Sequence, residues 1–195
     1  STPIKSSAAS DVYKRQFLIC RSFFFLCITP IDRITFIIYA MPKSLSPQEA
    51  LHKAAAYCSS GEQCCYDISE KLKKWGIEDS EASKIIEYLI KQRFIDEARY
   101  AKGFTNDKFR FNKWGKTKIA YALRQKKIPE TLIDEALYNI NEEQYRDTLL
   151  QILENKQKNT KAADKYDLHA KLFRFAASKG FEPDIIQSVI QSMKL

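Results

Sequence analysis

The sequence predicts an all-α protein built as an elongated tandem array of three three-helix repeats. Three observations lead to this fold class. The 195 residues include only five glycines and six prolines, set among many residues that favour helices, so turn-forming residues are sparse. Apolar residues recur at helical spacing, and one such pattern occurs three times along the chain. Strands are not expected.

The three copies of the pattern are anchored on Ile77, Ile128 and Phe181, which lie 51 and 53 residues apart. Past each anchor, apolar residues follow at positions that share one face of an α-helix. Each interval accommodates three short helices, and a single unit of that size buries little apolar surface by itself, so neighbouring units should pack together. The stripes consist of Ala82, Ile85, Ile86 and Leu89, then Leu132, Ile133, Ala136, Leu137 and Ile140, then Ile185, Ile186, Val189, Ile190 and Met193.

The first repeat is expected over residues 41–94, with helices at 47–59, 65–75 and 79–92. Lys74 and Gly76 suit the end of its second helix. The acidic and small residues that follow suit the first turn of its third helix.

The second repeat is expected over residues 95–140, with helices at 96–111, 115–126 and 129–140. Pro129 begins its third helix, where a proline without an N–H is well tolerated.

The third repeat is expected over residues 141–195, with helices at 141–158, 165–178 and 183–193. Residues 159–161 form the break between its first two helices, and Pro183 opens the third.

Residues 1–40 read differently from the rest of the chain. Their apolar runs are interrupted by Arg21, Pro30 and Asp32, so none reaches the length of about 20 residues needed to span a membrane. No small-x-small cleavage pattern follows the runs, which argues against export. We expect this segment to be upstream or artefactual sequence, disordered or loosely helical, and the protein to begin at Met41.

Composition argues against an enzyme and against a cofactor. The glycines are too far apart for a phosphate-binding loop, and His52 and His169 lack a metal-binding or catalytic pattern. The five cysteines are odd in number and follow no disulfide scaffold, which favours a reducing compartment, the cytoplasm. Cys58, Cys64 and Cys65 form no CxxC pair, so a zinc site or a thiol enzyme built on them is a disfavoured alternative.

Charge is concentrated in the second repeat. The chain carries a formal net charge of +8, and ten basic residues but one acidic residue, Asp107, lie between Arg99 and Lys127. An anionic partner is therefore expected there, the alternative being a merely solvated basic face. The candidate contact residues are Arg99, Lys108, Arg110, Lys113, Lys116, Lys118, Tyr121, Arg124, Lys126 and Lys127.

The helix at 115–126 gives this surface an orientation. Ile119, Ala122 and Leu123 are expected to form its buried face, which leaves Tyr121 and Arg124 pointing outward. The backbone amides at its start, from residue 115 onward, are expected to be free to bind phosphate or a carboxylate. Aromatic residues lie between the charges, and most of them are expected in the core.

Residues 95–104 (IDEARYAKGF) and 113–137, which include Trp114-Gly115 and the KKIP sequence at 126–129, resemble the RecX family of recombination regulators. The resemblance extends more weakly to 72–77 and 179–181. The sequence departs from the family pattern at Trp114, where a basic residue is usual, and at Ala122, where an acidic residue is usual.

The resemblance implies tandem three-helix repeats and a non-enzymatic regulator of the recombinase RecA. Such a protein binds along the groove of the RecA filament on single-stranded DNA and restrains strand exchange and ATP hydrolysis. We expect the RecA filament as partner, with single-stranded DNA within or near the contact, no membrane, and a monomer. The alternative is a direct DNA-binding helical protein that uses the basic middle repeat, in helix-turn-helix fashion.

Overall fold

The computed structural model describes residues 45–193, and the expectations about residues 1–40 lie outside them. In this part of the chain there are nine α-helices and no strand, so the all-α prediction is confirmed. Each helix begins and ends within two residues of its predicted bounds. The helices are α3 (Pro47–Ser60), α4 (Cys65–Lys74), α5 (Asp79–Lys91), α6 (Glu97–Arg110), α7 (Lys116–Gln125), α8 (Glu130–Tyr138), α9 (Glu142–Lys158), α10 (Lys165–Lys179) and α11 (Pro183–Ser192).

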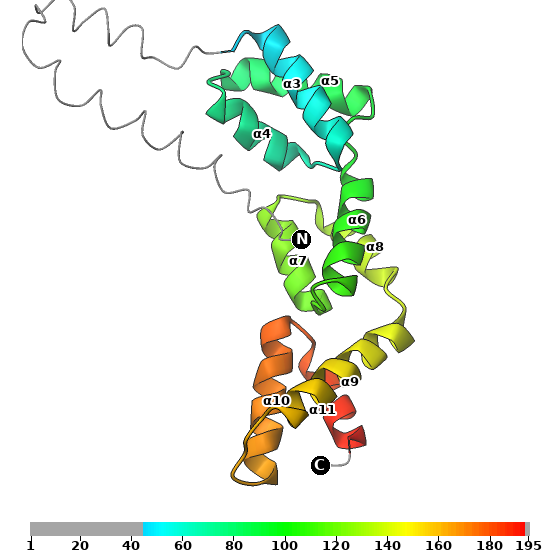
Figure 1. Cartoon of the computed structure of the whole chain (residues 1–195). Helices are drawn as coiled ribbons and strands as arrows, with labels where there is room; N and C mark the ends of the chain where they lie inside the picture. Colours follow the sequence, from blue (N-terminus) through cyan, green and yellow to red (C-terminus); the bar gives the residue numbers. More distant parts are fainter. Residues whose placement is uncertain (1–44, 194–195) are drawn as a thin grey trace, which may run out of the picture. The chain divides into compact units, whose positions relative to one another are not determined.

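The helices form three successive three-helix bundles, as Figure 1 shows for the described residues. Bundle 1 consists of α3–α5, bundle 2 of α6–α8 and bundle 3 of α9–α11, and the extensive helix–helix packing lies within each bundle. The tandem array predicted from the three anchors is therefore confirmed. The boundaries proposed at 94/95 and 140/141 stay a prediction.

The first helix of every bundle begins with a side-chain cap. Ser46 forms a reciprocal capping box with Glu49, while Asp96 accepts a hydrogen bond from the Arg99 amide at 2.9 Å and Asn141 accepts one from the Gln144 amide at 2.9 Å. These caps satisfy backbone donors that a helix start leaves without a partner.

The second helix of every bundle ends in the same backbone turn. The residue before each anchor has a left-handed conformation, with φ of 76° at Gly76, 57° at Lys127 and 88° at Gly180. Each anchor amide then donates back to a carbonyl five residues earlier, for example from Ile128 to Leu123 at 3.3 Å. This turn reverses the chain and places Ile77, Ile128 and Phe181 in the core, where at most 7% of each residue is exposed.

The buried residues form two hydrophobic cores. One lies mainly within bundle 1, and the other runs continuously through bundles 2 and 3 and includes Cys64 at the start of α4. Phe109 of α6, Tyr145 of α9 and Phe181 before α11 join the last two bundles, with ring centroids 5.7 Å and 4.9 Å apart. Such aromatic pairs contribute about 0.5–1.5 kcal/mol each beyond the area they bury. Bundles 2 and 3 are therefore one packed unit.

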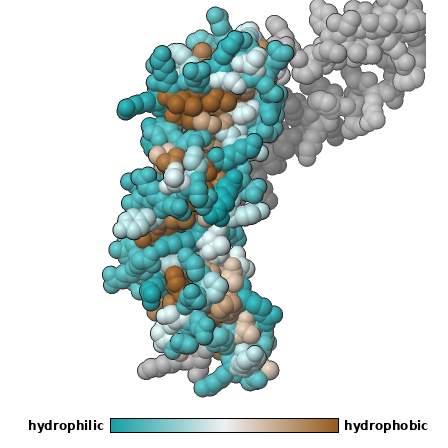
Figure 2. All heavy atoms as spheres, turned by 180° about the vertical axis from the view of Figure 1, so that it is seen from behind, coloured by the Kyte–Doolittle hydropathy of each residue, from teal (hydrophilic) through white to brown (hydrophobic). Residues whose placement is uncertain are grey.

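The outer faces of the helices are mostly hydrophilic. Figure 2 shows this on one side of the molecule, where hydrophilic side chains cover most of the surface and separate apolar patches interrupt them. The stripe predicted for α7 needs one correction, because Ala120 is buried with Ile119 and Leu123 whereas Ala122 is half-buried. No described helix is long and apolar enough to span a membrane.

Candidate interaction surface

Two cations of bundle 2 are paired with carboxylates of bundle 1. Lys126, just after α7, contacts Asp67 of α4 at 2.5 Å in a partly buried pair. Arg99 of α6 places its Nε 2.6 Å from Glu62, in the connection between α3 and α4. These two predicted contact residues thus hold the first two bundles together, and their charges are largely compensated within the chain.

Two more of the predicted residues also have partners within the chain. The ammonium group of Lys127 lies 5.3 Å from the centre of the Tyr66 ring of α4. Arg124 donates from Nε to Glu130 at 3.0 Å, and this hydrogen bond lowers the pKa of the Glu130 carboxyl below its ordinary value. Arg124 is exposed as predicted, but its charge is shared with a neighbouring carboxylate.

Lys116 belongs to the junction between bundles 2 and 3. Its ammonium group pairs with Glu142 of α9, and its backbone amide donates to the hydroxyl of Tyr145 at 2.9 Å. The same hydroxyl donates to Glu182 at 2.6 Å. Burial is the largest cause that raises the pKa of Tyr145, and the hydrogen bond to Glu182 is the second. Tyr145 is fully buried and therefore serves as a polar link inside the shared core.

The start of α7 is not the free anion site that the sequence predicts. The Gly115 amide donates to the Lys179 carbonyl at 2.9 Å and the Thr117 amide to the Gly180 carbonyl at 3.1 Å. With the Lys116 amide on Tyr145, the first three amides at this helix start are all engaged. The end of α10 and Tyr145 thus occupy the Gly115, Lys116 and Thr117 amides, which are not available to a phosphate or carboxylate.

Trp114 lies between two lysine side chains. The ammonium group of Lys108 is 5.4 Å from the centre of its ring and that of Lys118 is 4.9 Å away, both within the range of a cation–π interaction. Lys118 also donates to the Ser178 carbonyl at 3.1 Å. Neither lysine has an ion pair with a carboxylate in the described residues, so both positive charges are uncompensated.

The end of α6, its connection to α7 and the outer face of α7 carry further candidate groups. Arg110 and Lys113 have no ion pair among the described residues, and Phe111 between them is 80% exposed. Tyr121, on the outer face of α7, is 63% exposed, as predicted. We name Lys108, Arg110, Lys113 and Lys118 the basic cluster. Of the ten predicted residues, Lys108, Arg110, Lys113, Lys118 and Lys127 form no ion pair with a carboxylate among the described residues, and the first four lie at or beside the connection between α6 and α7.

The interleaved aromatic residues divide between core and surface. Tyr100 and Phe109 are buried, and Phe104 and Trp114 are half-buried, as expected for most of the set. Tyr121 and Phe111 are the exposed exceptions, and Phe111 lies between Arg110 and Lys113 in the chain. Phe111 follows the last turn of α6, two residues past the buried Phe109, so it points away from the buried face of that helix.

The cysteines of bundle 1 lie in surroundings that are typical of structural rather than reactive cysteines. Burial raises the pKa of the Cys64 thiol to about 11 and that of Cys65 to about 12, which keeps both protonated and weakly nucleophilic near neutral pH. Cys64 is fully buried and contacts Asp67 at 3.3 Å. Within residues 45–193, no three His, Cys, Asp or Glu side chains are arranged to hold a metal.

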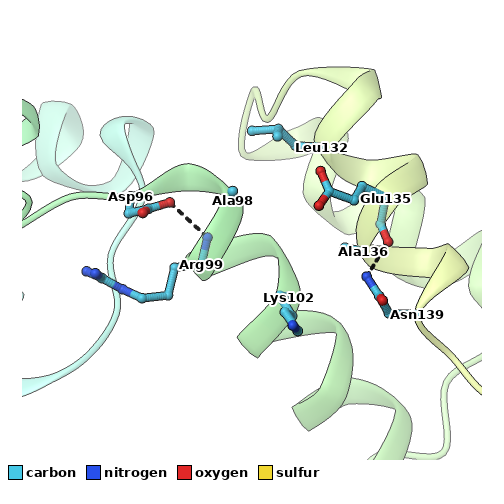
Figure 3. Close-up of a pocket in the computed structure, with 8 residues that line it drawn as sticks. All are labelled: Asp96, Ala98, Arg99, Lys102, Leu132, Glu135, Ala136 and Asn139. Carbon is cyan, nitrogen blue, oxygen red and sulfur yellow. Dashed lines mark hydrogen bonds between the residues drawn. The ribbon is translucent and has the colours of Figure 1, made fainter.

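A hollow of about 250 Å³ lies between α6 and α8. Figure 3 shows Lys102 on α6 and, across the hollow, Glu135 and Asn139 on α8. Two polar residues that line the hollow are hydrogen-bonded at helix ends. Asp96 caps the start of α6, and the Asn139 side chain donates to the Glu135 carbonyl at the end of α8, at 2.7 Å. The hollow holds no nucleophile hydrogen-bonded to a base.

Two family models match consecutive parts of the chain. The model of the second three-helix domain of RecX matches residues 96–137, and that of the third matches residues 142–190. These ranges coincide with bundles 2 and 3. The chain belongs to the RecX family.

Curated RecX relatives agree with this membership. The chain is 34% identical over 129 residues to the regulatory protein RecX of Clostridium beijerinckii, a match that covers 65% of this chain and 60% of that relative. It is 33% identical over 129 residues to the regulatory protein RecX of Clostridium perfringens strain 13, with the same coverage. The match thus spans about 60% of the length of these relatives, which are named regulatory proteins rather than enzymes.

Solved RecX structures share the fold. A crystal structure of RecX from Lactobacillus salivarius superposes with a TM-score of 0.66 at 21% identity, covering 75% of this chain and 95% of that one. A second crystal structure of a regulatory protein RecX gives a TM-score of 0.69 at 21% identity, covering 85% of this chain and 79% of that one. RecX proteins thus share the tandem helical architecture of residues 45–193.

Proposed function

We propose that this protein is a non-enzymatic regulator that binds the filament formed by RecA on single-stranded DNA and restrains strand exchange and ATP hydrolysis. Membership of the RecX family supports the proposal, because the resemblance to that family implies this role. In this proposal the protein is a cytoplasmic monomer without a cofactor, and single-stranded DNA lies within or near the contact.

The architecture supports binding to a repeating partner. Three bundles in succession present separate contact surfaces along one chain. Several weak contacts on one chain give a higher combined affinity than any single contact, provided that their spacing matches the partner. A filament offers such repeated surfaces.

The observation that carries the proposal is the basic cluster. Its four cations have no ion pair within the described residues, whereas Arg99, Lys116, Arg124 and Lys126 are each paired with a carboxylate. An uncompensated cation gains more from an anionic partner than one that must first leave its own carboxylate. We therefore place the main contact at the junction of α6 and α7 and give the four paired residues a structural role.

The test is inhibition of RecA by the full chain on single-stranded DNA, measured as ATP hydrolysis and as strand exchange. Wild-type protein is expected to inhibit both. In the triple variant Lys108→Glu, Arg110→Glu, Lys113→Glu, three cations that would face an anionic partner become anions. This variant is expected to need about tenfold more protein or more for the same inhibition, which corresponds to a loss of binding free energy of about 1.4 kcal/mol.

A matched control reverses three cations of bundle 3 that are exposed and unpaired: Arg146→Glu, Lys158→Glu, Lys165→Glu. It carries the same change in net charge and is expected to inhibit nearly as well as wild type. Equal inhibition by the first variant and wild type contradicts the placement of the contact. Absence of inhibition by wild type contradicts the proposed function.

A further inference from the structure

The connection between α6 and α7 holds an aromatic ring in solvent among uncompensated cations. This connection, residues 111–114, is here named the Phe111 loop. Phe111 is 80% exposed, and Arg110 precedes it and Lys113 follows it closely in the chain, both without an ion pair in the described residues. An exposed apolar side chain alone indicates little, but an exposed ring among free cations is the combination that binds unpaired nucleobases and their phosphates.

The loop is held in one conformation by backbone hydrogen bonds. The Phe111 amide donates to the Asp107 carbonyl at 2.9 Å, the Lys113 amide to the Phe109 carbonyl at 3.2 Å, and the Trp114 amide to the Lys108 carbonyl at 3.1 Å. The residue at 113 has a left-handed conformation with φ of 54°, which is less favourable for lysine than for glycine. The ring is thus presented by a fixed turn, so binding requires little ordering of the chain.

The groups around the loop are predominantly positive. The backbone carbonyl of Lys179 accepts from the Gly115 amide just after the loop, at 2.9 Å. Asp107, on the last turn of α6, is the one carboxylate between Arg99 and Lys127 and has no ion pair in the described residues. Glu142 nearby is engaged by Lys116. The local charge therefore favours a polyanion.

We infer that the Phe111 loop is a binding site for single-stranded nucleic acid, in which an unpaired base stacks on Phe111 and adjacent phosphates contact the basic cluster. Paired bases in a duplex do not expose a face to the ring, so the site prefers single strands. The inference rests on the proposed function only in its choice of single-stranded DNA as the probe, and it requires no RecA.

The test is the affinity of the full chain for a fluorescently labelled oligo(dT), measured by anisotropy without RecA. Phe111→Ala is expected to raise Kd about tenfold, because stacking on an aromatic side chain contributes a factor of this order per base. The ring is exposed, so its removal leaves the fold intact, which circular dichroism checks. Binding to a duplex of the same length is expected to be weaker and unchanged by the substitution.

Tyr138→Ala is the matched control. Tyr138 is 90% exposed at the end of α8, but the same helix carries Asp134 and Glu135 rather than cations. This variant is expected to bind oligo(dT) as wild type does. Reversal of Lys108, Arg110 and Lys113 to glutamate is expected to reduce the slope of log Kd against log salt by about 2, because each phosphate contact on a single strand contributes about 0.7.

An unchanged Kd for Phe111→Ala overturns the inference. If that variant binds oligo(dT) normally but inhibits RecA poorly, the loop contacts protein and the inference is wrong, while the proposed function stands. If oligo(dT) binding depends on Phe111 but wild-type protein does not inhibit RecA, the inference stands and the proposed function fails.

Discussion

Replacing Gly115 with alanine tests the junction between bundles 2 and 3. A Cβ at this position lies 2.1 Å from the Gly180 carbonyl oxygen, 2.3 Å from its carbon and 2.4 Å from the Phe181 nitrogen. All three atoms belong to the backbone, so no side-chain rotation relieves the contact. The same stretch accepts the hydrogen bonds of the Gly115 and Thr117 amides. The substitution must therefore move α7 away from the end of α10.

The expected cost follows from these contacts. Overpacking of a close contact costs about 1–3 kcal/mol, and each of two hydrogen bonds stretched or lost adds about 1 kcal/mol. Because the clash is with backbone, we expect a destabilisation of about 4 kcal/mol, which lowers Tm by about 8–16 °C for a protein of this size. Thermal and urea unfolding followed by circular dichroism measure it.

Gly103→Ala is the control with the opposite sign. Gly103 lies inside α6, and a Cβ there meets nothing within 4 Å. Since alanine is more favourable than glycine in a helix by about 1 kcal/mol, this variant is expected to be more stable than wild type. Unfolding of Gly115→Ala at the wild-type midpoint, or a shift of both variants in the same direction, refutes the reasoning.

Three further predictions concern polar groups that are buried or partly buried. Tyr145→Phe leaves Glu182 without its buried donor and is expected to destabilise the fold by about 1–3 kcal/mol in urea unfolding; a loss below 0.5 kcal/mol contradicts the link. A double-mutant cycle on Asp67→Asn and Lys126→Met is expected to give a coupling of about 1 kcal/mol that declines with salt, and zero coupling contradicts the pairing. Because the folded-state pKa of Cys64 is raised from 9.0 to about 11, the stability it contributes is present below pH 9 and is lost as pH rises toward 11. The urea midpoint of wild type is thus expected to fall more between pH 8 and pH 10.5 than that of Cys64→Ala, and equal falls contradict this.

The helices were predictable because local information determines them. The apolar stripes, the prolines at 129 and 183 and the basic or glycine residues at the helix ends all lie within a few residues of the features they specify. The repeat was found because its anchors, Ile77, Ile128 and Phe181, occupy the same backbone turn in each bundle. Small side chains carry less information: the apolar pattern predicts Ala122 on the buried face of α7, whereas Ala120 is the alanine buried there.

The candidate surface was predictable only as a region. Which cations are free depends on partners far along the chain: Lys126 pairs with Asp67, 59 residues earlier, and Lys118 contacts the Ser178 carbonyl 60 residues later. The amides at the start of α7 are occupied by carbonyls of Lys179 and Gly180 for the same reason. The distribution of charge along the sequence shows that the second repeat is the most basic part of the protein, but tertiary contacts decide which of its charges are compensated.

Co-sedimentation of the full chain with RecA filaments assembled on single-stranded DNA tests the central claim most directly. The account predicts that wild type and the bundle 3 control (Arg146, Lys158 and Lys165 reversed) pellet alike. The variant with Lys108, Arg110 and Lys113 reversed should stay mostly in the supernatant while keeping the wild-type melting curve. Equal pelleting of all three proteins contradicts the assignment of the contact to the basic cluster.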